Sequence, residues 1–382
     1  MPSLLYVVNT PRFFLSHRLS LALAAQTAGY RVEVATGPGS ARDAALIDAA
    51  GFGHHRLPLA RSSTNPAHEV RLCAALSGLF RRLRPDLVHL VTIKPVLYGG
   101  LLARLFRVPG VVSAISGMGH VFADDRHRAL RWGVEQLYGA ALGHRNGRVI
   151  LQNELDRHDL QRIGALPFGR DVTMPGSGVD LDTFYPTPLP AAESRPLVVL
   201  PARMVWDKGV SEFVQAARQL QSSGVDARFA LVGAEDPDSA HPVPRRQLQE
   251  WQLQGEVEWW GYRDDMPEVL AAASLVVLPS TYREGMPKAL QEAAASGRAI
   301  VTTDAPGCRD VVDPGRSGLL IRPGDALDLA EKIGTLLADR PRLAAMGACG
   351  RRKAEAEFGV EQVVAAHLEV YRALSEWRAR AF

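Results

Sequence analysis

The sequence is poor in cysteine and has no long apolar run. Its three cysteines, Cys73, Cys308 and Cys349, are far apart and have no cysteine or histidine neighbours at metal-ligand spacing. This argues against a zinc site and a disulfide framework. The longest apolar stretches, such as residues 96–105, are shorter than the roughly 20 residues of a membrane-spanning helix. The chain begins at Met1 without the basic segment and cleavage site of a secretion signal. We therefore expect a cytoplasmic protein that does not cross a membrane.

Charge is unevenly divided along the chain. The whole sequence carries a formal net charge of +3, but residues 1–185 hold 21 Lys and Arg against 14 Asp and Glu. This excess of positive charge in the N-terminal half favours a negatively charged partner. A diphosphate, an anionic membrane surface and a nucleic acid all meet that requirement, and charge alone does not decide among them.

The chain length of 382 residues, with 47% hydrophobic residues, favours two domains. Short apolar runs alternate with helical patterns, which is typical of βα units around a parallel sheet. In a first series, strands are expected at residues 4–8, 32–36, 87–90, 110–114 and 149–151, and a helix at 16–28. In a second series, strands are expected at residues 197–200, 229–232, 257–260, 275–278 and 299–301.

Turn-forming residues separate the two series around residues 175–190. The predicted fold class is therefore α/β, with two doubly wound Rossmann-like domains that face each other across a cleft. The expected boundaries are residues 1–180 for the N-terminal domain and 181–365 for the C-terminal domain. A C-terminal helix over 366–382 is expected to pack back on the N-terminal domain. Such sheets bind ligands at the carboxyl ends of their strands, so the loops after strands carry the functional candidates.

The most informative loop covers residues 280–293, which follow a buried strand and open a helix. Pro287 suits the first helical position, where a missing N–H costs nothing. The backbone amides of residues 288–290 would then be free and would point toward the cleft. A helix start of this kind receives a phosphate well.

Two glutamates belong to the same segment, Glu284 in the loop and Glu292 in the helix. Both can face one pocket and accept hydrogen bonds from hydroxyls of a sugar or ribose. The run Glu-Gly-Met-Pro-Lys-x-Leu-x-Glu-Ala resembles the donor signature of family-four retaining glycosyltransferases, which have the GT-B fold. The resemblance implies that Glu284 contacts the transferred sugar and that Glu292 binds the ribose. A helix with two exposed glutamates is the plainer alternative.

A second loop, residues 201–209, also follows a predicted strand. The same resemblance implies that Arg203 and Lys208 bind the nucleotide diphosphate. Departure of a nucleoside diphosphate builds negative charge, and two fixed cations would stabilise it in place of a metal. Two solvated surface cations are the alternative.

Further segments extend the likeness to most of residues 175–325. Residues 260–264 lie where family members read the nucleobase, and residues 303–310 match the loop after a later strand. Trp259 and Trp260 are expected in the core rather than as a base-stacking platform. The implied donor-binding set is Arg203, Lys208, Gly261, Tyr262, Arg263, Glu284, Gly285, Met286, Pro287, Lys288, Ala289, Leu290 and Glu292.

The N-terminal half, expected to bind the acceptor, resembles the family less closely. Many relatives carry a glycine pair after the first strand, whereas this chain reads Asn9-Thr10-Pro11-Arg12. Its residues 13–18, 92–100 and 115–122 resemble a bacterial subgroup that glycosylates undecaprenyl-diphosphate-linked sugars. That subgroup includes N-acetylgalactosaminyltransferases of glycan assembly.

Four residues of this half are candidates for the site. His120 lies in a glycine-rich loop and could face the donor sugar or the acceptor, with simple loop packing as the alternative. Lys94 could meet an acceptor phosphate or be a solvated lysine. His17 and Arg12 are further acceptor-binding candidates, and for His17 a helix cap or a core contact is the alternative.

The segment 69–84 predicts a helix with an apolar face flanked by arginines. Such a helix could rest on an anionic bilayer, which would place the protein on the inner face of the cell membrane. Alternatively, the apolar face packs against the sheet and the charged ends are solvated. Membrane recruitment would suit the lipid-linked acceptor that the subgroup implies.

The resemblance implies a retaining, metal-independent hexosyltransferase with no cofactor besides its nucleotide-sugar co-substrate. Its catalytic group would comprise Glu284, His120, Arg203 and Lys208. The expected reaction moves a sugar, with N-acetylhexosamine preferred, from a UDP-sugar to a lipid-diphosphate-linked or other glycan acceptor. Its setting would be the assembly of bacterial surface polysaccharide, lipopolysaccharide or glycoprotein glycans, with an anionic membrane surface as a further partner and no nucleic acid.

Other interpretations remain open at this point. Asp180 and Asp182 spell an Asp-x-Asp of the kind that binds a metal in other transferases, but they fall at the linker and predict a turn. A sugar-nucleotide epimerase could use the same scaffold, and so could a non-catalytic nucleotide-sugar-binding protein. A hydride-transferring dehydrogenase is disfavoured because no Gly-x-Gly-x-x-Gly follows the first strand.

Overall fold

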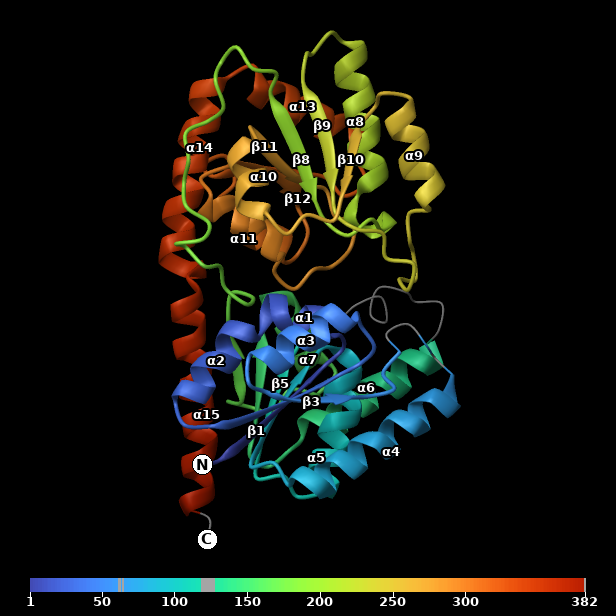
Figure 1. Cartoon of the computed structure of the whole chain (residues 1–382), viewed down its shortest axis with the longest axis vertical. Coiled ribbons are helices and arrows are strands. Elements are labelled where there is room, and N and C mark those ends of the chain that lie inside the picture. The colour runs from blue at the N-terminus through green and yellow to red at the C-terminus, as the bar shows by residue number, and fades with distance from the viewer. Residues whose placement is uncertain (61–62, 64, 118–127, 381–382) are drawn as a thin grey trace. The chain divides into compact units, whose positions relative to one another are not determined.

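The computed structural model describes residues 1–60, 63, 65–117 and 128–380, and the chain forms two α/β units (Figure 1). Unit 1 comprises Met1–Ser177 and Glu361–Phe382, and unit 2 comprises Gly178–Val360. The chain therefore enters unit 2 once and then returns to unit 1 through its last helix.

Unit 1 is built on a seven-stranded parallel sheet in the order β3-β2-β1-β4-β5-β6-β7. Its central strands are apolar and buried on both faces, as a parallel sheet covered by helices requires. The strands are β1 Ser3–Val8, β2 Arg31–Thr36, β3 Gly53–Arg56, β4 Leu87–Val91, β5 Gly110–Ala114, β6 Gly147–Leu151 and β7 Asp171–Thr173. The helical elements are α1 Pro11–His17, α2 Leu19–Thr27, α3 Ala41–Ala49, α4 Pro66–Leu83, the π-helix η1 Pro95–Gly99, α5 Gly100–Leu105, α6 Arg128–Leu142, α7 Glu154–Arg162 and α15 Val360–Arg380.

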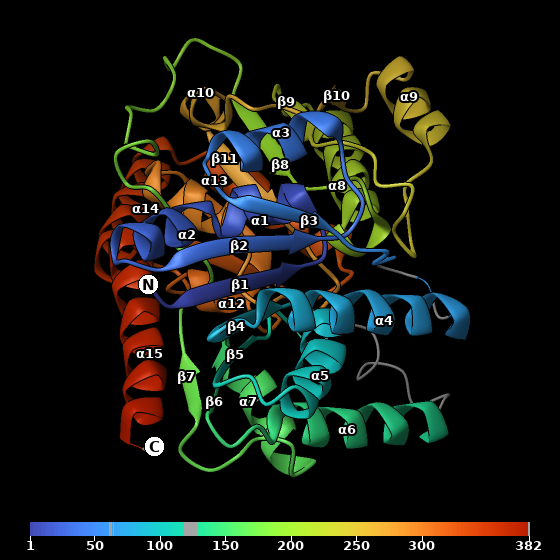
Figure 2. The ribbon, with the colours of Figure 1, turned by 60° about the horizontal axis from the view of Figure 1, so that its bottom comes forward.

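Helices cover both faces of this sheet (Figure 2). Apolar side chains of α4, α5, α6 and α7 share one buried cluster with strand residues. Side chains of α1, α2, α3 and α15 form the cluster on the other face, where Tyr371 of α15 packs with Tyr6 of β1. The C-terminal helix is thus part of the core of unit 1.

The first helical region differs from the single helix expected over residues 16–28. The structure has two helices that meet at the buried Arg18, and the first begins at Pro11. The Thr10 side chain accepts a hydrogen bond from the Phe13 N–H, and Pro11 takes the first helical position. A helix start signal of this kind was present in the sequence, and the single-helix prediction missed it.

The helix α4 settles the two alternatives for its apolar face. Leu72, Leu76, Leu79 and Phe80 are buried in the core of unit 1. The bilayer-facing alternative for this face is therefore wrong, because the sheet already covers these side chains. Among the described residues, no helix combines the length and the apolar character that crossing a bilayer requires.

Unit 2 is built on a six-stranded parallel sheet in the order β10-β9-β8-β11-β12-β13. The strands are β8 Leu197–Pro201, β9 Arg228–Val232, β10 Glu258–Gly261, β11 Leu275–Leu278, β12 Ala299–Thr303 and β13 Gly318–Ile321. The helical elements are η4 Trp206–Lys208, α8 Val210–Ser222, α9 Arg245–Leu253, α10 Met266–Ala272, α11 Lys288–Ala295, α12 Cys308–Val311, α13 Ala326–Leu337, α14 Arg340–Lys353 and the π-helix η5 Ala354–Phe358. Both sheets thus have the doubly wound order that the sequence predicts.

Each sheet has a topological switch point, where the strand order reverses. In unit 1 the strands β1 and β4 are neighbours, and in unit 2 the strands β8 and β11 are neighbours. Open parallel sheets bind ligands beyond the carboxyl ends of the strands at such points. The loops after these four strands are therefore the first places to look for a site.

Candidate functional site

The switch point of unit 2 brings together two of the predicted site residues. Lys208 comes from the loop after β8, and Glu284 comes from the loop after β11. The Lys208 Nζ donates to Glu284 Oε1 at 2.5 Å, and both side chains are mostly buried. The two sequence motifs therefore meet in one charged pair, 76 residues apart in the chain.

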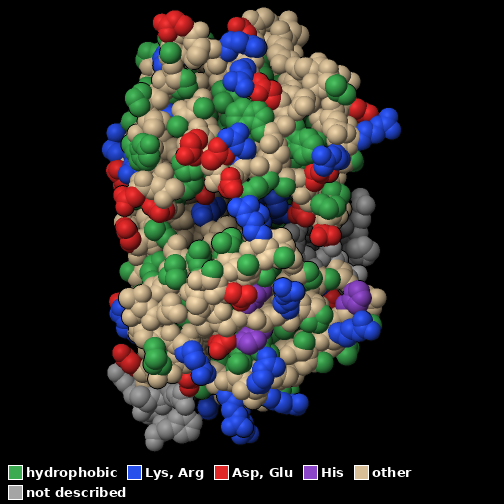
Figure 3. All heavy atoms as spheres, viewed as in Figure 1, with side chains coloured by type: hydrophobic (Ala, Val, Ile, Leu, Met, Phe, Trp, Pro, Cys, Tyr) green, Lys and Arg blue, Asp and Glu red, His purple; other side chains and the backbone are tan. Residues whose placement is uncertain are grey.

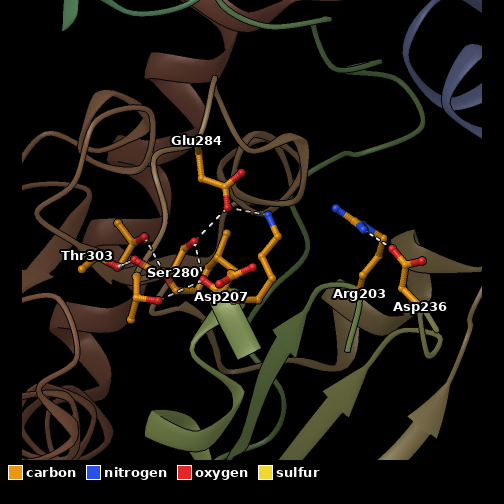
Figure 4. Close-up of polar contacts among 10 residues, drawn as sticks. Arg203, Asp207, Asp236, Ser280, Glu284 and Thr303 are labelled. Carbon is orange, nitrogen blue, oxygen red and sulfur yellow. Dashed lines mark hydrogen bonds and ion pairs between the residues drawn. The ribbon is translucent and has the colours of Figure 1, made fainter. Parts of the chain in front are cut away.

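Neighbouring polar groups hold this pair in place (Figure 4). Ser280 Oγ lies 2.8 Å from Glu284 Oε1 and 3.0 Å from the Asp207 carbonyl oxygen. Thr303 Oγ1 donates to the Ser280 carbonyl at 2.7 Å. The contacts tie the loops after β8, β11 and β12 to one another, so the carboxylate of Glu284 is fixed before any ligand arrives.

Backbone packing supports the same arrangement. Gly307, after β12, has a positive φ of 81°, and a side chain there would place its Cβ 2.2 Å from the Gly285 carbonyl oxygen. Only glycine permits this approach. The loop that carries Glu284 is therefore buttressed by the loop after β12.

Arg203, the other predicted phosphate ligand, pairs with a residue that the sequence motifs did not single out. Its guanidinium donates to Asp236 in the loop after β9, and the Asp236 side chain is mostly buried. Figure 4 shows this pair at the same edge of the sheet as Glu284, with Arg203 directed at Asp236. Asp236 comes four positions after the end of β9. This position after a strand is the sequence feature that could have identified it as a site residue.

The helix α11 begins one residue later than expected. Pro287 is the N-cap rather than the first helical residue, and the Leu290 N–H donates to the Pro287 carbonyl at 3.1 Å. The prediction of a free Leu290 amide is therefore wrong, because the helix opens with a tighter turn. The helix start still lies in the loop after β11, at the edge that carries Glu284.

Glu292 lies inside α11 and is mostly buried. Its Oε1 is 3.6 Å from the Lys288 Nζ on the preceding turn. Burial raises the pKa of the Glu292 carboxyl, and the charge of Lys288 offsets part of that increase. The group can thus accept or share hydrogen bonds with a hydroxyl in a protected position.

The segment expected to read the nucleobase follows β10. Gly261 has a positive φ of 67°, Tyr262 is half exposed, and Arg263 donates to Asp265 at 2.6 Å. Trp259 and Trp260 both pack against core clusters of unit 2, on opposite faces of the sheet. Both are only partly buried, so they lie at the margin of the core, and the role of this segment in reading the base stays a prediction.

Lys94 of unit 1 is engaged in the structure. Its ammonium donates to the Ala60 carbonyl, the Ser63 carbonyl and Glu69 Oε1 at 2.6 to 2.7 Å. Lys94 is therefore not the solvated lysine expected as the alternative from the sequence, because its ammonium is already hydrogen-bonded. An acceptor phosphate would have to replace one of these three contacts.

Two further unit 1 candidates, Arg12 and His17, lie on α1. His17 stacks on Phe13 with ring centroids 4.1 Å apart, and its Nδ1 is 2.6 Å from Ser16 Oγ. Arg12 is exposed and lies 3.9 Å from Asp43. His120 lies outside the described residues.

The Asp-x-Asp of the linker forms a turn, as predicted. Asp180 Oδ1 accepts hydrogen bonds from the N–H groups of Asp182 and Thr183, and these bonds lower the pKa of the Asp180 carboxyl. Within the described part of the chain, no group of three or more His, Cys, Asp or Glu side chains is placed to hold a metal ion.

Comparisons with known proteins match both units. Residues 195–339 match the family model "Glycosyl transferases group 1", and residues 3–153 match "Glycosyl transferase 4-like". An alpha-maltose-1-phosphate synthase of Mycolicibacterium smegmatis is 30% identical over 313 residues, which cover 73% of this chain and 77% of the relative. The chain belongs to the group 1 glycosyltransferases. It is a glycosyltransferase of the GT4 type.

Two other proteins are similar to this chain over most of their length. The N,N'-diacetylbacillosaminyl-diphospho-undecaprenol alpha-1,3-N-acetylgalactosaminyltransferase of Campylobacter jejuni is 29% identical over 292 residues, covering 73% of this chain and 75% of that one. Among solved structures, Anabaena HepE in complex with UDP superposes with a TM-score of 0.77 at 18% identity, covering 98% of this chain and all of that one. This structural likeness confirms the GT-B fold of the glycosyltransferase.

Proposed function

We propose that this glycosyltransferase moves an N-acetylhexosamine from a UDP-sugar to a glycan linked to undecaprenyl diphosphate, with retention and without a metal. The observation that carries the proposal is the Lys208–Glu284 pair at the switch point of unit 2. It joins a cation for the leaving diphosphate to a carboxylate for the transferred sugar.

The geometry suggests how the donor is held. Lys208 and Arg203 follow β8, and each is paired with a carboxylate at the carboxyl edge of the sheet. A diphosphate is a stronger partner for these cations, so its arrival would draw Lys208 away from Glu284. The released Glu284 oxygen can then accept a hydrogen bond from a sugar hydroxyl. Binding of the two halves of the donor is thereby coupled.

Catalysis in this proposal rests on charge and position. As the bond to the sugar breaks, negative charge grows on the leaving phosphate, and cations fixed beside it stabilise the transition state. Glu284 orients the sugar, and Glu292 on α11 would hold the ribose. The acceptor hydroxyl attacks the face from which the phosphate departs, and the leaving phosphate oxygen accepts its proton.

The printed name of the Campylobacter relative supports the finer assignment of donor and acceptor. That relative transfers N-acetylgalactosamine to a sugar carried on undecaprenyl diphosphate. The resemblance covers three quarters of both chains, which makes the same class of acceptor our first choice for this protein.

The test is a transfer assay with the purified full-length chain. UDP-N-acetylgalactosamine, UDP-N-acetylglucosamine, UDP-glucose and GDP-mannose are each offered with a synthetic undecaprenyl-diphosphate-linked N-acetylated sugar. We expect transfer from a UDP-N-acetylhexosamine, an α-linked product by NMR, and full activity with EDTA. A β-linked product would contradict retention. Conversion of the nucleotide sugar without an acceptor would show an epimerase instead.

A membrane-surface location belongs to the same proposal. Arg81, Arg82, Arg84, Arg104 and Arg107 lie at the ends of α4 and α5, and all five are exposed. Within the described residues, no Asp or Glu forms an ion pair with any of them. Lys and Arg side chains gather at the lower end of unit 1 in Figure 3. Such a cluster is attracted to anionic headgroups.

Vesicle flotation tests this location. We expect the protein to float with vesicles in which about one lipid in three is phosphatidylglycerol. With vesicles of neutral phosphatidylcholine alone, it should remain at the bottom of the gradient. Replacing Arg81, Arg82 and Arg84 by Ser should weaken the flotation. Equal behaviour of the two vesicle types would contradict the proposed role of the arginines.

A further inference from the structure

The backbone of unit 1 is strained at its own switch point. Thr92 directly follows β4 and has a φ of 74°. Its Cβ branching makes this left-handed conformation costly, and such strain persists only where the surrounding structure imposes it. The Thr92 N–H donates to the Ala114 carbonyl of β5, and its carbonyl accepts from the Val96 N–H.

The segment after Thr92 is also irregular. Residues Pro95–Gly99 form a π-helix, a rare element that is frequent at functional sites. At its end, a Cβ on Gly99 would lie 2.5 Å from a Leu90 methyl group. The π-helix therefore packs directly on β4, the strand that ends at the strained residue.

The neighbouring strand β1 ends in a polar side chain without a partner. Asn9 Oδ1 is buried, and it accepts no hydrogen bond. Asn9 follows Val8, and β1 and β4 are in register with Val7 beside Leu90, so Asn9 and Thr92 hold equivalent positions. The loop after β2 fixes this site, because a Cβ on Gly37 would lie 2.4 Å from the Asn9 carbonyl oxygen.

The strand on the other side of β4 ends in the same way. Ser116 comes two residues after the end of β5, and its buried Oγ has no hydrogen-bond partner. Because Val91 of β4 lies beside Ala114 of β5, Ser116 belongs to the same edge as Thr92. Three adjacent strands thus end in one strained residue flanked by two unsatisfied polar atoms.

We propose that this edge of unit 1 binds hydroxyl groups of the acceptor glycan, with Asn9 and Ser116 as its hydrogen-bonding residues and Thr92 as the residue that positions them. The inference rests on the proposed function and assigns acceptor recognition to side chains that the family motifs do not include. Buried polar atoms are usually paired in folded proteins, so these two atoms at one sheet edge are positioned to form hydrogen bonds with a bound molecule.

The atoms also indicate which part of the acceptor is bound. An amide oxygen such as Asn9 Oδ1 only accepts hydrogen bonds, whereas a phosphate has no proton to donate at neutral pH. Sugar hydroxyls and the N–H of an N-acetyl group are donors. Asn9 Oδ1 is therefore matched to the glycan, whereas the NH2 group of the same amide can donate to either the glycan or the diphosphate.

Steady-state kinetics of the full chain with variants at these positions test the proposal. Asn9→Ala and Ser116→Ala should each raise the acceptor KM about tenfold, with the donor KM unchanged, since one hydrogen bond is lost in each. Asn9→Asp keeps an accepting oxygen and should restore most of the binding. Ser20→Ala, on the exposed side of α2, is the matched control and should match the wild type.

Thr92→Gly separates strain from folding. Glycine adopts a φ of 74° without steric cost but holds it less rigidly, so the variant should melt close to the wild type while its acceptor KM rises. If Asn9→Ala and Ser116→Ala bind UDP normally and their acceptor KM is unchanged, the inference about acceptor binding is overturned. The proposed function would still stand in that case. A rise in the donor KM would place these residues on the donor side and also overturn it. Absence of UDP binding in the wild type would instead defeat the proposed function.

Discussion

The two units share one fold and differ in the chemistry at the carboxyl edges of their sheets. In unit 2 the loops after the switch-point strands present paired charges, Lys208 with Glu284 and Arg203 with Asp236. In unit 1 the equivalent edge presents unsatisfied neutral groups, and its Lys94 cation holds the backbone of residues 60 and 63. The scaffold thus fixes where a ligand can bind, and the loop residues decide which ligand it is.

Lys208→Ala should have the largest effect, because it removes a cation from the edge of unit 2. We expect kcat to fall about 10²- to 10³-fold, as is typical when one transition-state donor is removed. Lys332→Ala is the control, since Lys332 forms ion pairs with Asp328 and Glu331 of its own helix, far in sequence from the loops after β8 and β11. Equal loss of activity in both variants would remove the special role of Lys208.

Glu284→Gln should come next. The change keeps the size of the side chain and removes the charge that pairs with Lys208. We expect kcat to fall about 10²-fold, with Glu331→Gln as the control. Because the two residues act as a unit, the double variant with Lys208→Ala should lose much less than the product of the single losses. If the loss of kcat in the double variant equals the product of the two single losses, Lys208 and Glu284 act independently.

Lys94→Met tests the structural role that distinguishes the cation of unit 1. Loss of the ammonium leaves Glu69 and two carbonyls without their donor in a mostly buried position. We expect the free energy of unfolding to fall by about 2–3 kcal/mol. This loss is at or below the smallest losses seen for broken buried ion pairs, because solvent partly reaches the Lys94–Glu69 pair. Urea denaturation measures it. Recovery of stability in a Lys94→Met, Glu69→Leu double variant would support the pairing, and no loss in the single variant would refute it.

A buried histidine should make unit 1 sensitive to acid. His367 on α15 donates to the Val363 carbonyl, and burial beside Arg18 lowers its pKa from 6.5 to about 3. Arg18 and His89 lie beside it, and burial lowers the pKa of His89 as well. Below pH 6.5 the unfolded chain binds the proton and the folded chain does not. Stability contributed by the neutral ring is therefore present above pH 6.5 and is lost as pH falls toward 3.

The expected loss per histidine is up to about 1.4 kcal/mol for each pH unit below the unfolded pKa. Urea denaturation between pH 7 and 5 should show a shallower decline in His367→Gln than in the wild type. A change of Glu331 to Gln, on the surface of unit 2, should leave the slope as it is. Identical slopes in wild type and His367→Gln would contradict the buried neutral histidine.

The sequence predicted the two sheets and the meeting of Lys208 with Glu284 because their signals are local. Apolar runs mark the strands, and the loops with Lys208 and Glu284 directly follow two of them. The partners Asp236 and Ser280 were missed, since their roles depend on which strands become neighbours. The engagement of Lys94 depends on a loop more than 30 residues away. The break at Arg18 was missed for a different reason, because the Thr10-Pro11 start signal was overlooked.

The most direct test of the account is calorimetric titration of UDP into the wild type, Arg203→Ala and Lys208→Ala. If cations at the carboxyl edge of unit 2 bind a nucleoside diphosphate, the wild type should bind UDP. Each variant should bind UDP at least about tenfold more weakly, which corresponds to about 1.4 kcal/mol or more. Equal affinity of all three proteins for UDP would contradict it.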